Sequence, residues 1–207
     1  GQVYGQGEMA RQPIKPAAFR AGRSLHLYCS RHNLGASAIG AELTELMRGQ
    51  FDVLVTSSIG QLDACEHMLL YLTSATWTRG DESAAFAREV CEALRKGVHL
   101  LPCHEFPSML GDGEERRACP FNDFWREGWT PRWLLKGDAN VYNQIAIALK
   151  GGAWREAGLA KLAQALAKGG GDRARWLAIP EEPAESDSRS AALLRAASHA
   201  ARFATSA

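Results

Sequence analysis

The stretch Ser30–Asn33 follows the first predicted strand, residues 24–30, and carries polar side chains that could bind a nucleotide. Open parallel sheets place their ligand crevice at the carboxyl ends of strands, so Arg31 could meet a pyrophosphate there and Trp77 could stack on a base. The candidate cofactor-binding residues are Ser30, Arg31 and Trp77. The structural alternatives are Asn33 as a helix cap, an exposed Arg31 and Trp77 packed against the sheet edge, and these alternatives are favoured.

A carboxylate on the helix predicted over residues 83–96 is a second candidate group. At 100° per residue, Glu89 lies about 60° from Phe86, at the edge of an apolar stripe. The stripe is formed by Phe86, Val90, Ala93 and Leu94. A carboxylate at this edge would be partly desolvated, whereas Glu92 would face solvent. The alternative is that Glu89 flanks the stripe and pairs with a neighbouring cation.

Two other motifs do not support a site. Cys103-His104-Glu105 offers metal-ligand side chains, but successive strand residues point to opposite faces and do not converge on one ion. Residues 35–40 resemble a nucleophile elbow and a phosphate loop, yet Ile39 replaces the elbow's second glycine and the loop's Lys-Ser/Thr pair is missing. We therefore expect no metal and no required cofactor.

Apolar periodicity predicts the elements that position these residues. The predicted strands are residues 24–30, 51–56, 68–73, 98–103 and 132–135. The predicted helices are residues 35–47, 83–96 capped by Ser83, 138–150 capped by Asp138, and 153–168. The residues expected in central buried strands are Leu27, Val53, Leu70 and Leu100.

This element order predicts an α/β fold of the flavodoxin-like type, with a mainly parallel sheet, helices on both faces and a C-terminal helical extension. We divide the chain into an extended N-terminal arm (1–22), an α/β domain (23–150) and a C-terminal helical extension with a low-complexity tail (151–207). The tail contains an acidic linker at 180–190 and a short amphipathic helix at 191–204.

Composition excludes several classes of protein. Lys and Arg number 24 against 23 Asp and Glu, so no global field favours nucleic acid. The densest apolar run, residues 68–72, is far too short to cross a bilayer, so we expect no integral membrane protein. The five cysteines are odd in number and widely spaced, which predicts reduced thiols and an intracellular, reducing compartment, whether cytoplasm or organelle.

Three segments in order resemble the Toll/interleukin-receptor (TIR) family: Met68-Leu-Leu-Tyr-Leu-Thr-Ser-Ala-Thr-Trp77, Phe86-Ala-Arg-Glu89-Val-Cys-Glu-Ala-Leu94 and Gly97-Val-His-Leu-Leu-Pro102. In that family a buried strand leads through a small-residue turn into a helix bearing a glutamate, and a Gly-x-x-hydrophobic-Pro strand follows. Here Ala85–Phe86 occupies the place of the family's Trp-Cys pair. The likeness spans roughly residues 24–149 and is specific over 68–102.

The resemblance implies an interaction or signalling module whose partners are other proteins or further copies of itself. It also implies a catalytic role for Glu89, because TIR enzymes cleave the bond between nicotinamide and ribose in NAD, which would then be the substrate. One departure favours a module without catalysis: residues 57–66 are too few for the family's long loop and full helix between the second and third strands. A third hypothesis is an accessory subunit of a larger assembly, held by its terminal arms.

Overall fold

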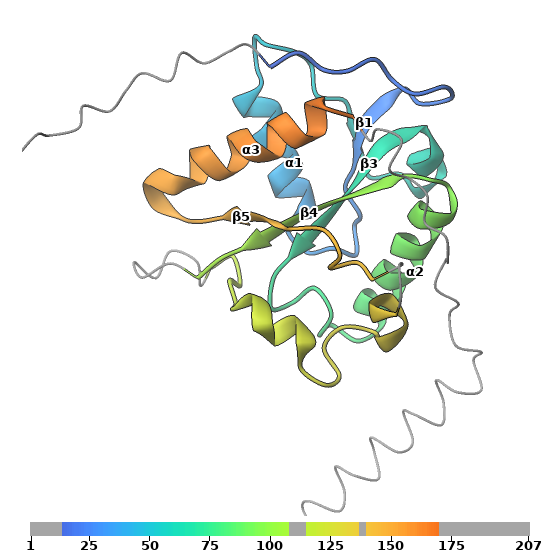
Figure 1. The fold of residues 1–207 in the computed structure, drawn as a ribbon, viewed down its shortest axis with the longest axis vertical. Helices are drawn as coiled ribbons and strands as arrows, with labels where there is room; N and C mark the ends of the chain where they lie inside the picture. The colour runs from blue at the N-terminus through green and yellow to red at the C-terminus, as the bar shows by residue number, and fades with distance from the viewer. Residues whose placement is uncertain (1–13, 108–114, 137–139, 170–207) are drawn as a thin grey trace, which may run out of the picture.

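A single parallel sheet organises the chain (Figure 1). A computed structural model describes residues 14–107, 115–136 and 140–169, and within this part five strands pair in the order β2-β1-β3-β4-β5. The strands are β1 Leu25–Tyr28, β2 Val55–Thr56, β3 Cys65–Leu72, β4 His99–Glu105 and β5 Ile147–Leu149. All four pairings are parallel, and β3 with β4 forms the longest ladder, from His67 opposite His99 to Leu72 opposite His104.

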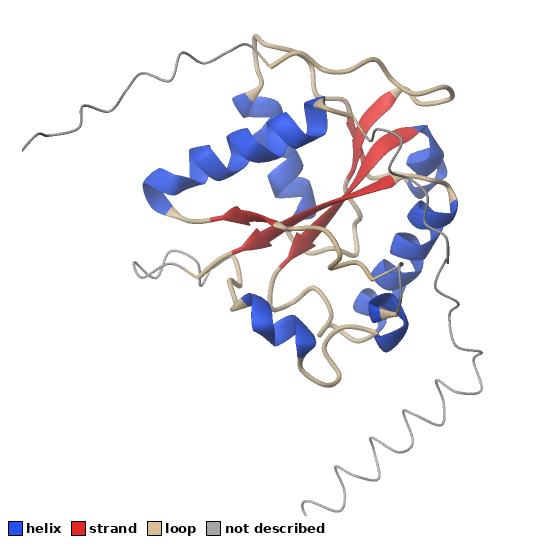
Figure 2. Ribbon diagram, viewed as in Figure 1, coloured by secondary structure: helices blue, strands red, loops and turns tan. Residues whose placement is uncertain are grey.

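Helices cover both faces of this sheet (Figure 2). α1 (Ala36–Leu46) and α3 (Arg155–Ala167) contact each other on one face, and α2 (Asp81–Arg95) covers the other. β3 is buried along its whole length, so its side chains alternate between two apolar clusters. Leu70 packs toward α2, whereas Leu69 packs toward α1 and α3. The predicted fold class, with helices on both faces, is confirmed.

Three of the four residues predicted in central strands are confirmed and one is wrong. Leu27, Leu70 and Leu100 lie in the interior strands β1, β3 and β4. Val53 is buried but lies outside β2, which begins at Val55 and forms an edge of the sheet. The reason is local: the backbone N–H of Leu54 donates to Nδ1 of the His26 ring at 3.1 Å, so a side chain replaces the first rung of the ladder.

The region after β4 contains two further corrections. Residues 132–135, predicted as a strand, form the 3-10 helix η3 (Arg132–Leu135). Pro131 precedes it and accepts the N–H of Leu134 at 2.9 Å, which closes a turn instead of extending the chain. Further 3-10 helices in the described part of the chain are η1 Ile59–Ala64, η2 Phe121–Trp125 and η5 Gly152–Trp154.

The predicted helix over residues 138–150 does not form in its described part, 140–150. Its last residues form β5 instead, where Ile147 pairs with Cys103 and the N–H of Phe106 donates to the Leu149 carbonyl at 2.8 Å. The helical spacing of apolar residues was misleading because the open edge of β4 offers hydrogen bonds that a helix would leave unused, and tertiary pairing overrides local pattern. Ile145, whose spacing from Val141 and Leu149 favoured a helix with these three side chains on one apolar face, is 96% exposed.

The ends of the described chain pack on the domain. Residues 14–22 contain no helix or strand, but the N–H of Ala17 donates to the carbonyl of Ala167 at 2.7 Å and Arg20 forms an ion pair with Glu66 at 2.6 Å. The helix predicted over 153–168 is confirmed as α3, and it packs into the same apolar cluster as α1. The predicted division at residue 150 stays a prediction.

The predicted turn at residues 111–113, the linker at 180–190 and the helix at 191–204 lie outside the described residues. Over the described ranges, no helix is both long and apolar enough to cross a membrane.

Candidate functional site

Glu89 lies on α2 and faces the turn that follows β1. Its Oε1 is 3.8 Å from Nε2 of His32, and Nδ1 of the same ring is 2.9 Å from Oε2 of Glu82. The imidazole of His32 therefore lies between two carboxylates of one helix. The helix begins at Asp81, two residues before the predicted cap. Ser83 instead holds the preceding turn, since its hydroxyl accepts the N–H of Arg79 and donates to the carbonyl of Thr76.

The Glu89 carboxylate is largely withdrawn from water. Its side chain is 14% exposed, which confirms the predicted partial desolvation. Among the described residues, its buried Oε2 has no hydrogen-bond partner. Burial, the charge of the nearby Glu89 carboxylate and a hydrogen bond from the Tyr28 hydroxyl to that carboxylate raise the pKa of Tyr28. Most buried carboxylate oxygens are satisfied, so this one is an exception within the described residues.

The three predicted cofactor-binding residues lie in different environments. Ser30 is buried, and its hydroxyl accepts the N–H of His32 at 3.0 Å, close to Glu89. Arg31 is exposed. Trp77 is buried, stacks on Phe86 with ring centroids 5.2 Å apart, and donates its indole N–H to the Tyr142 hydroxyl at 2.8 Å. The structure thus brings Ser30 near Glu89, whereas Trp77 is buried against Phe86.

His104 and Glu105 point to opposite faces of the sheet, as strand alternation predicts. The Nε2 of His104 lies 2.7 Å from the carbonyl of Cys119, among aromatic rings of the loop after β4. Glu105 points to the α1 and α3 face, where the Tyr71 hydroxyl donates to it at 2.8 Å. In the part of the chain that the structure describes, no group of three His, Cys, Asp or Glu side chains could hold a metal ion.

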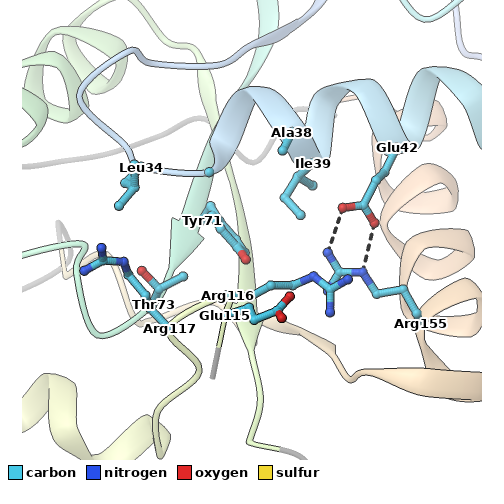
Figure 3. A pocket seen from close by; sticks show the side chains of 11 residues that line it. Leu34, Ala38, Ile39, Glu42, Tyr71, Thr73, Glu115, Arg116, Arg117 and Arg155 are labelled. Atoms are coloured by element: carbon cyan, nitrogen blue, oxygen red, sulfur yellow. Dashed lines mark hydrogen bonds and ion pairs between the residues drawn. The ribbon is translucent and has the colours of Figure 1, made fainter. Parts of the chain in front are cut away.

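A cavity of about 350 Å³ opens where the connections from the adjacent strands β1 and β3 leave for opposite faces of the sheet. We call it the Tyr71 cavity. Its walls come from residues 34–42 at the start of α1, from Tyr71 and Thr73 at the end of β3, from residues 115–117, and from Arg155 (Figure 3). Such a switch point is the usual ligand site of open α/β sheets. Neither Glu89 nor the three predicted cofactor-binding residues line it.

A charged network forms one wall of this cavity. The guanidinium of Arg155 donates to both oxygens of Glu42 at 2.9 Å and to both oxygens of Glu105 at 2.7 and 2.8 Å. Burial alone would lower the pKa of Arg155, but the bonds to Glu42 and Glu105 outweigh it and raise that pKa. Burial, followed by the Glu105 carboxylate, raises the pKa of Tyr71. The network therefore stays ionised at Arg155 and protonated at Tyr71 around neutral pH.

Sequence reasoning missed this cavity because its residues come from four separate segments. Residues 115–117 fall in a stretch that has no periodicity, and Arg155 opens a helix whose apolar side chains were the only visible signal. The adjacent pair Arg116–Arg117 in a long loop was the one feature that could have indicated an anion site.

Comparisons of the chain with models of protein families, with curated proteins and with solved structures find no match in any of the three.

Proposed function

We propose that this chain is a TIR-like recognition module whose partners include further copies of itself. One observation carries the proposal, namely the apolar surface at the edge formed by β2. Three side chains beside this edge are exposed, at 43% for Leu54, 37% for Val55 and 49% for Ile59. Within the described residues, the outer side of β2 pairs with no other strand.

The shortened connection after β2 explains why this edge is open. Residues 57–64 contain only η1, where a full helix would cover more of the sheet. An edge strand presents backbone groups that can pair with another chain, and adjacent apolar side chains add area to such a contact. A second copy offers the same surface, so the contact can be made symmetrically.

Light scattering over a concentration series tests this proposal. The double variant Leu54→Asp/Ile59→Asp should weaken self-association by at least about tenfold, because it places two charges in the contact. Ile145→Asp is the matched control, since Ile145 is 96% exposed and lies beyond the opposite edge strand. A wild-type chain that stays monomeric at every concentration, or an equal effect of the control, would contradict the proposal.

Cleavage of NAD at its nicotinamide bond is a second candidate function. The observation in its favour is the buried, unpartnered Oε2 of Glu89 beside Ser30 and His32. A carboxylate held in this way could stabilise positive charge on a ribose as the leaving group departs.

Nicotinamide release by the purified chain tests this second candidate. Glu89→Gln should lower turnover by on the order of 100-fold while leaving the fold intact. Glu92→Gln is the matched control, because Glu92 lies on the same helix and pairs with Arg95 and Lys96. Absence of NAD cleavage by the wild type would exclude this function for Glu89. The accessory-subunit hypothesis rests mainly on residues outside the described part and stays a prediction.

A further inference from the structure

We propose that His26 is a pH-sensitive switch at the β2 edge. While its ring is neutral, it holds residues 51–55 against β1. When the ring gains a proton, these residues open away from β1, and the apolar surface that contains Leu54 and Val55 is no longer held in place. Self-association through this surface would then weaken. Only that last step rests on the proposed function, and the opening itself is measured separately.

One hydrogen bond connects the ring of His26 to the edge. The backbone N–H of Leu54 donates to Nδ1 of His26 at 3.1 Å. A backbone N–H can only donate, so Nδ1 presents a lone pair, and the ring is neutral with its proton on Nε2. A proton on Nδ1 would place two N–H groups opposite each other and leave the Leu54 amide without its acceptor. Protonation of His26 and this hydrogen bond therefore exclude each other.

The backbone of Leu54 uses His26 for both of its polar groups. Its carbonyl accepts the N–H of His26 at 3.0 Å and that of Leu27 at 3.2 Å, while its own N–H goes to the ring. Further along β2, the carbonyl of Thr56 accepts the N–H of Cys29 at 2.8 Å. Loss of the ring bond therefore loosens the start of the edge, where the Leu54 side chain is exposed, and leaves the end of β2 attached.

The surroundings of His26 favour the neutral ring. The residue is 9% exposed, and the rings of Phe19 and Phe51 lie 4.6 and 5.4 Å from its own ring, centroid to centroid. Burial lowers the pKa of His26, and the Glu66 carboxylate on β3 opposes this only in part. Both oxygens of Glu66 accept hydrogen bonds from Arg20, one from its backbone N–H and one from Nε, which offsets the charge of the carboxylate.

The sign of the pH effect follows from this lowered pKa. Below pH 6.5, the ordinary pKa of histidine, the opened segment binds a proton that the closed segment does not bind. Opening therefore becomes more favourable as the pH falls below about 6.5, and the closed segment is favoured above it. Two further acids on neighbouring segments, Asp52 and Asp63, are exposed, so water and salt screen their charges.

Residue-resolved amide hydrogen exchange of the full chain tests the opening. Between pH 7 and pH 5 the protection of the Leu54 N–H should fall by about tenfold, the ratio that corresponds to the loss of one hydrogen bond. In His26→Asn the side-chain oxygen can still accept the Leu54 N–H and does not titrate, so the protection should change by less than about twofold. His32→Asn is the matched control, since His32 pairs with Glu82 on α2 and should leave the loss at Leu54 unchanged.

Nitrogen NMR of the His26 ring at pH 7 needs no variant. We expect the proton on Nε2, whereas a proton on Nδ1 would overturn the proposal. So would Leu54 protection that is equal at the two pH values, or that falls as much in His26→Asn as in the wild type.

Light scattering at pH 7 and pH 5 tests the consequence for self-association. The wild type should associate about tenfold more weakly at pH 5, and His26→Asn should lose most of this pH dependence. Equal association of the wild type at both pH values, with Leu54 opened at pH 5, would overturn the link between the switch and the surface. A chain that is monomeric at pH 7 would contradict the proposed function, while the exchange of the Leu54 amide would still decide whether His26 controls the edge.

Discussion

The face of the sheet under α1 and α3 buries ionisable side chains at both ends of β3, but their hydrogen bonding differs between the two ends. Near the carboxyl end, Glu105 is fully buried and paired with both Arg155 and Tyr71. Near the amino end, His67 is buried beside His99 with ring centroids 5.9 Å apart. Within the described residues, neither ring nitrogen of His67 has a hydrogen-bond partner.

The difference shows two ways in which a protein can bury an ionisable group: by pairing its charge or by keeping it neutral. A carboxylate deep in the protein keeps its charge only with partners that replace water. A histidine can give up its charge instead. Burial and the neighbouring His99 lower the pKa of His67 to about 4, while the nearby Glu66 carboxylate opposes this only in part.

The largest expected effect comes from breaking the paired end. Arg155→Ala would leave Glu105 buried without its cation, and the loss of a partner in a buried pair costs about 3–5 kcal/mol of the free energy of unfolding. Denaturant unfolding measures this change. Arg48→Ala, which breaks an exposed pair with Glu45, should cost less than about 0.5 kcal/mol. Similar losses in the two variants would show that burial of the Arg155 pair has no special weight.

Acid should destabilise the other end. The pKa of His67 is about 4 in the folded protein and 6.5 in the unfolded chain. Between these values the unfolded chain binds a proton that the folded protein does not bind. The contribution of neutral His67 to the free energy of unfolding is complete above about pH 6.5. It decreases as the pH falls toward 4, by about 2 kcal/mol at pH 5 and by about 3 kcal/mol in total. Unfolding measured at pH 7 and pH 5 checks the direction and size.

The variant His67→Leu isolates this contribution from other acid-sensitive groups, including His104, whose pKa burial also lowers. A neutral, unbonded imidazole replaced by an apolar side chain should change stability at pH 7 by about 1 kcal/mol or less. The variant should also lose about 2 kcal/mol less than the wild type between pH 7 and pH 5. An unchanged acid sensitivity would show that His67 is not the responsible group.

A smaller effect is expected from the hydroxyl that joins Tyr71 to the paired end. Tyr71→Phe removes one hydrogen bond to Glu105 but leaves the contact with Arg155, so the expected cost is about 1–2 kcal/mol. Thermal or denaturant unfolding at pH 7 measures it. A loss as large as that of Arg155→Ala would mean that the hydroxyl stabilises the buried Glu105 as much as the cation does.

The sequence by itself determined the parallel α/β class, the interior strands that contain Leu27, Leu70 and Leu100, and the partial burial of Glu89. Each of these follows from a local pattern: runs of apolar residues make buried strands, and the angle of Glu89 from Phe86 sets its place on the helix. The same reasoning failed for residues 140–150 because an open strand edge, distant in sequence, offered better hydrogen bonds than a helix.

Only the tertiary structure decided which polar groups meet. Arg155 lies 113 residues from Glu42 and 50 residues from Glu105 in the sequence, and no local periodicity relates the three residues. Their contact depends on α1, which packs over β3, lying beside α3, which packs over β4 and β5, and this arrangement is a property of the whole sheet. The Tyr71 cavity has the same origin, since its walls come from segments that the strand order brings together at the carboxyl ends of β1 and β3. Sequence patterns report what each element buries, whereas a site depends on how the elements are placed relative to one another.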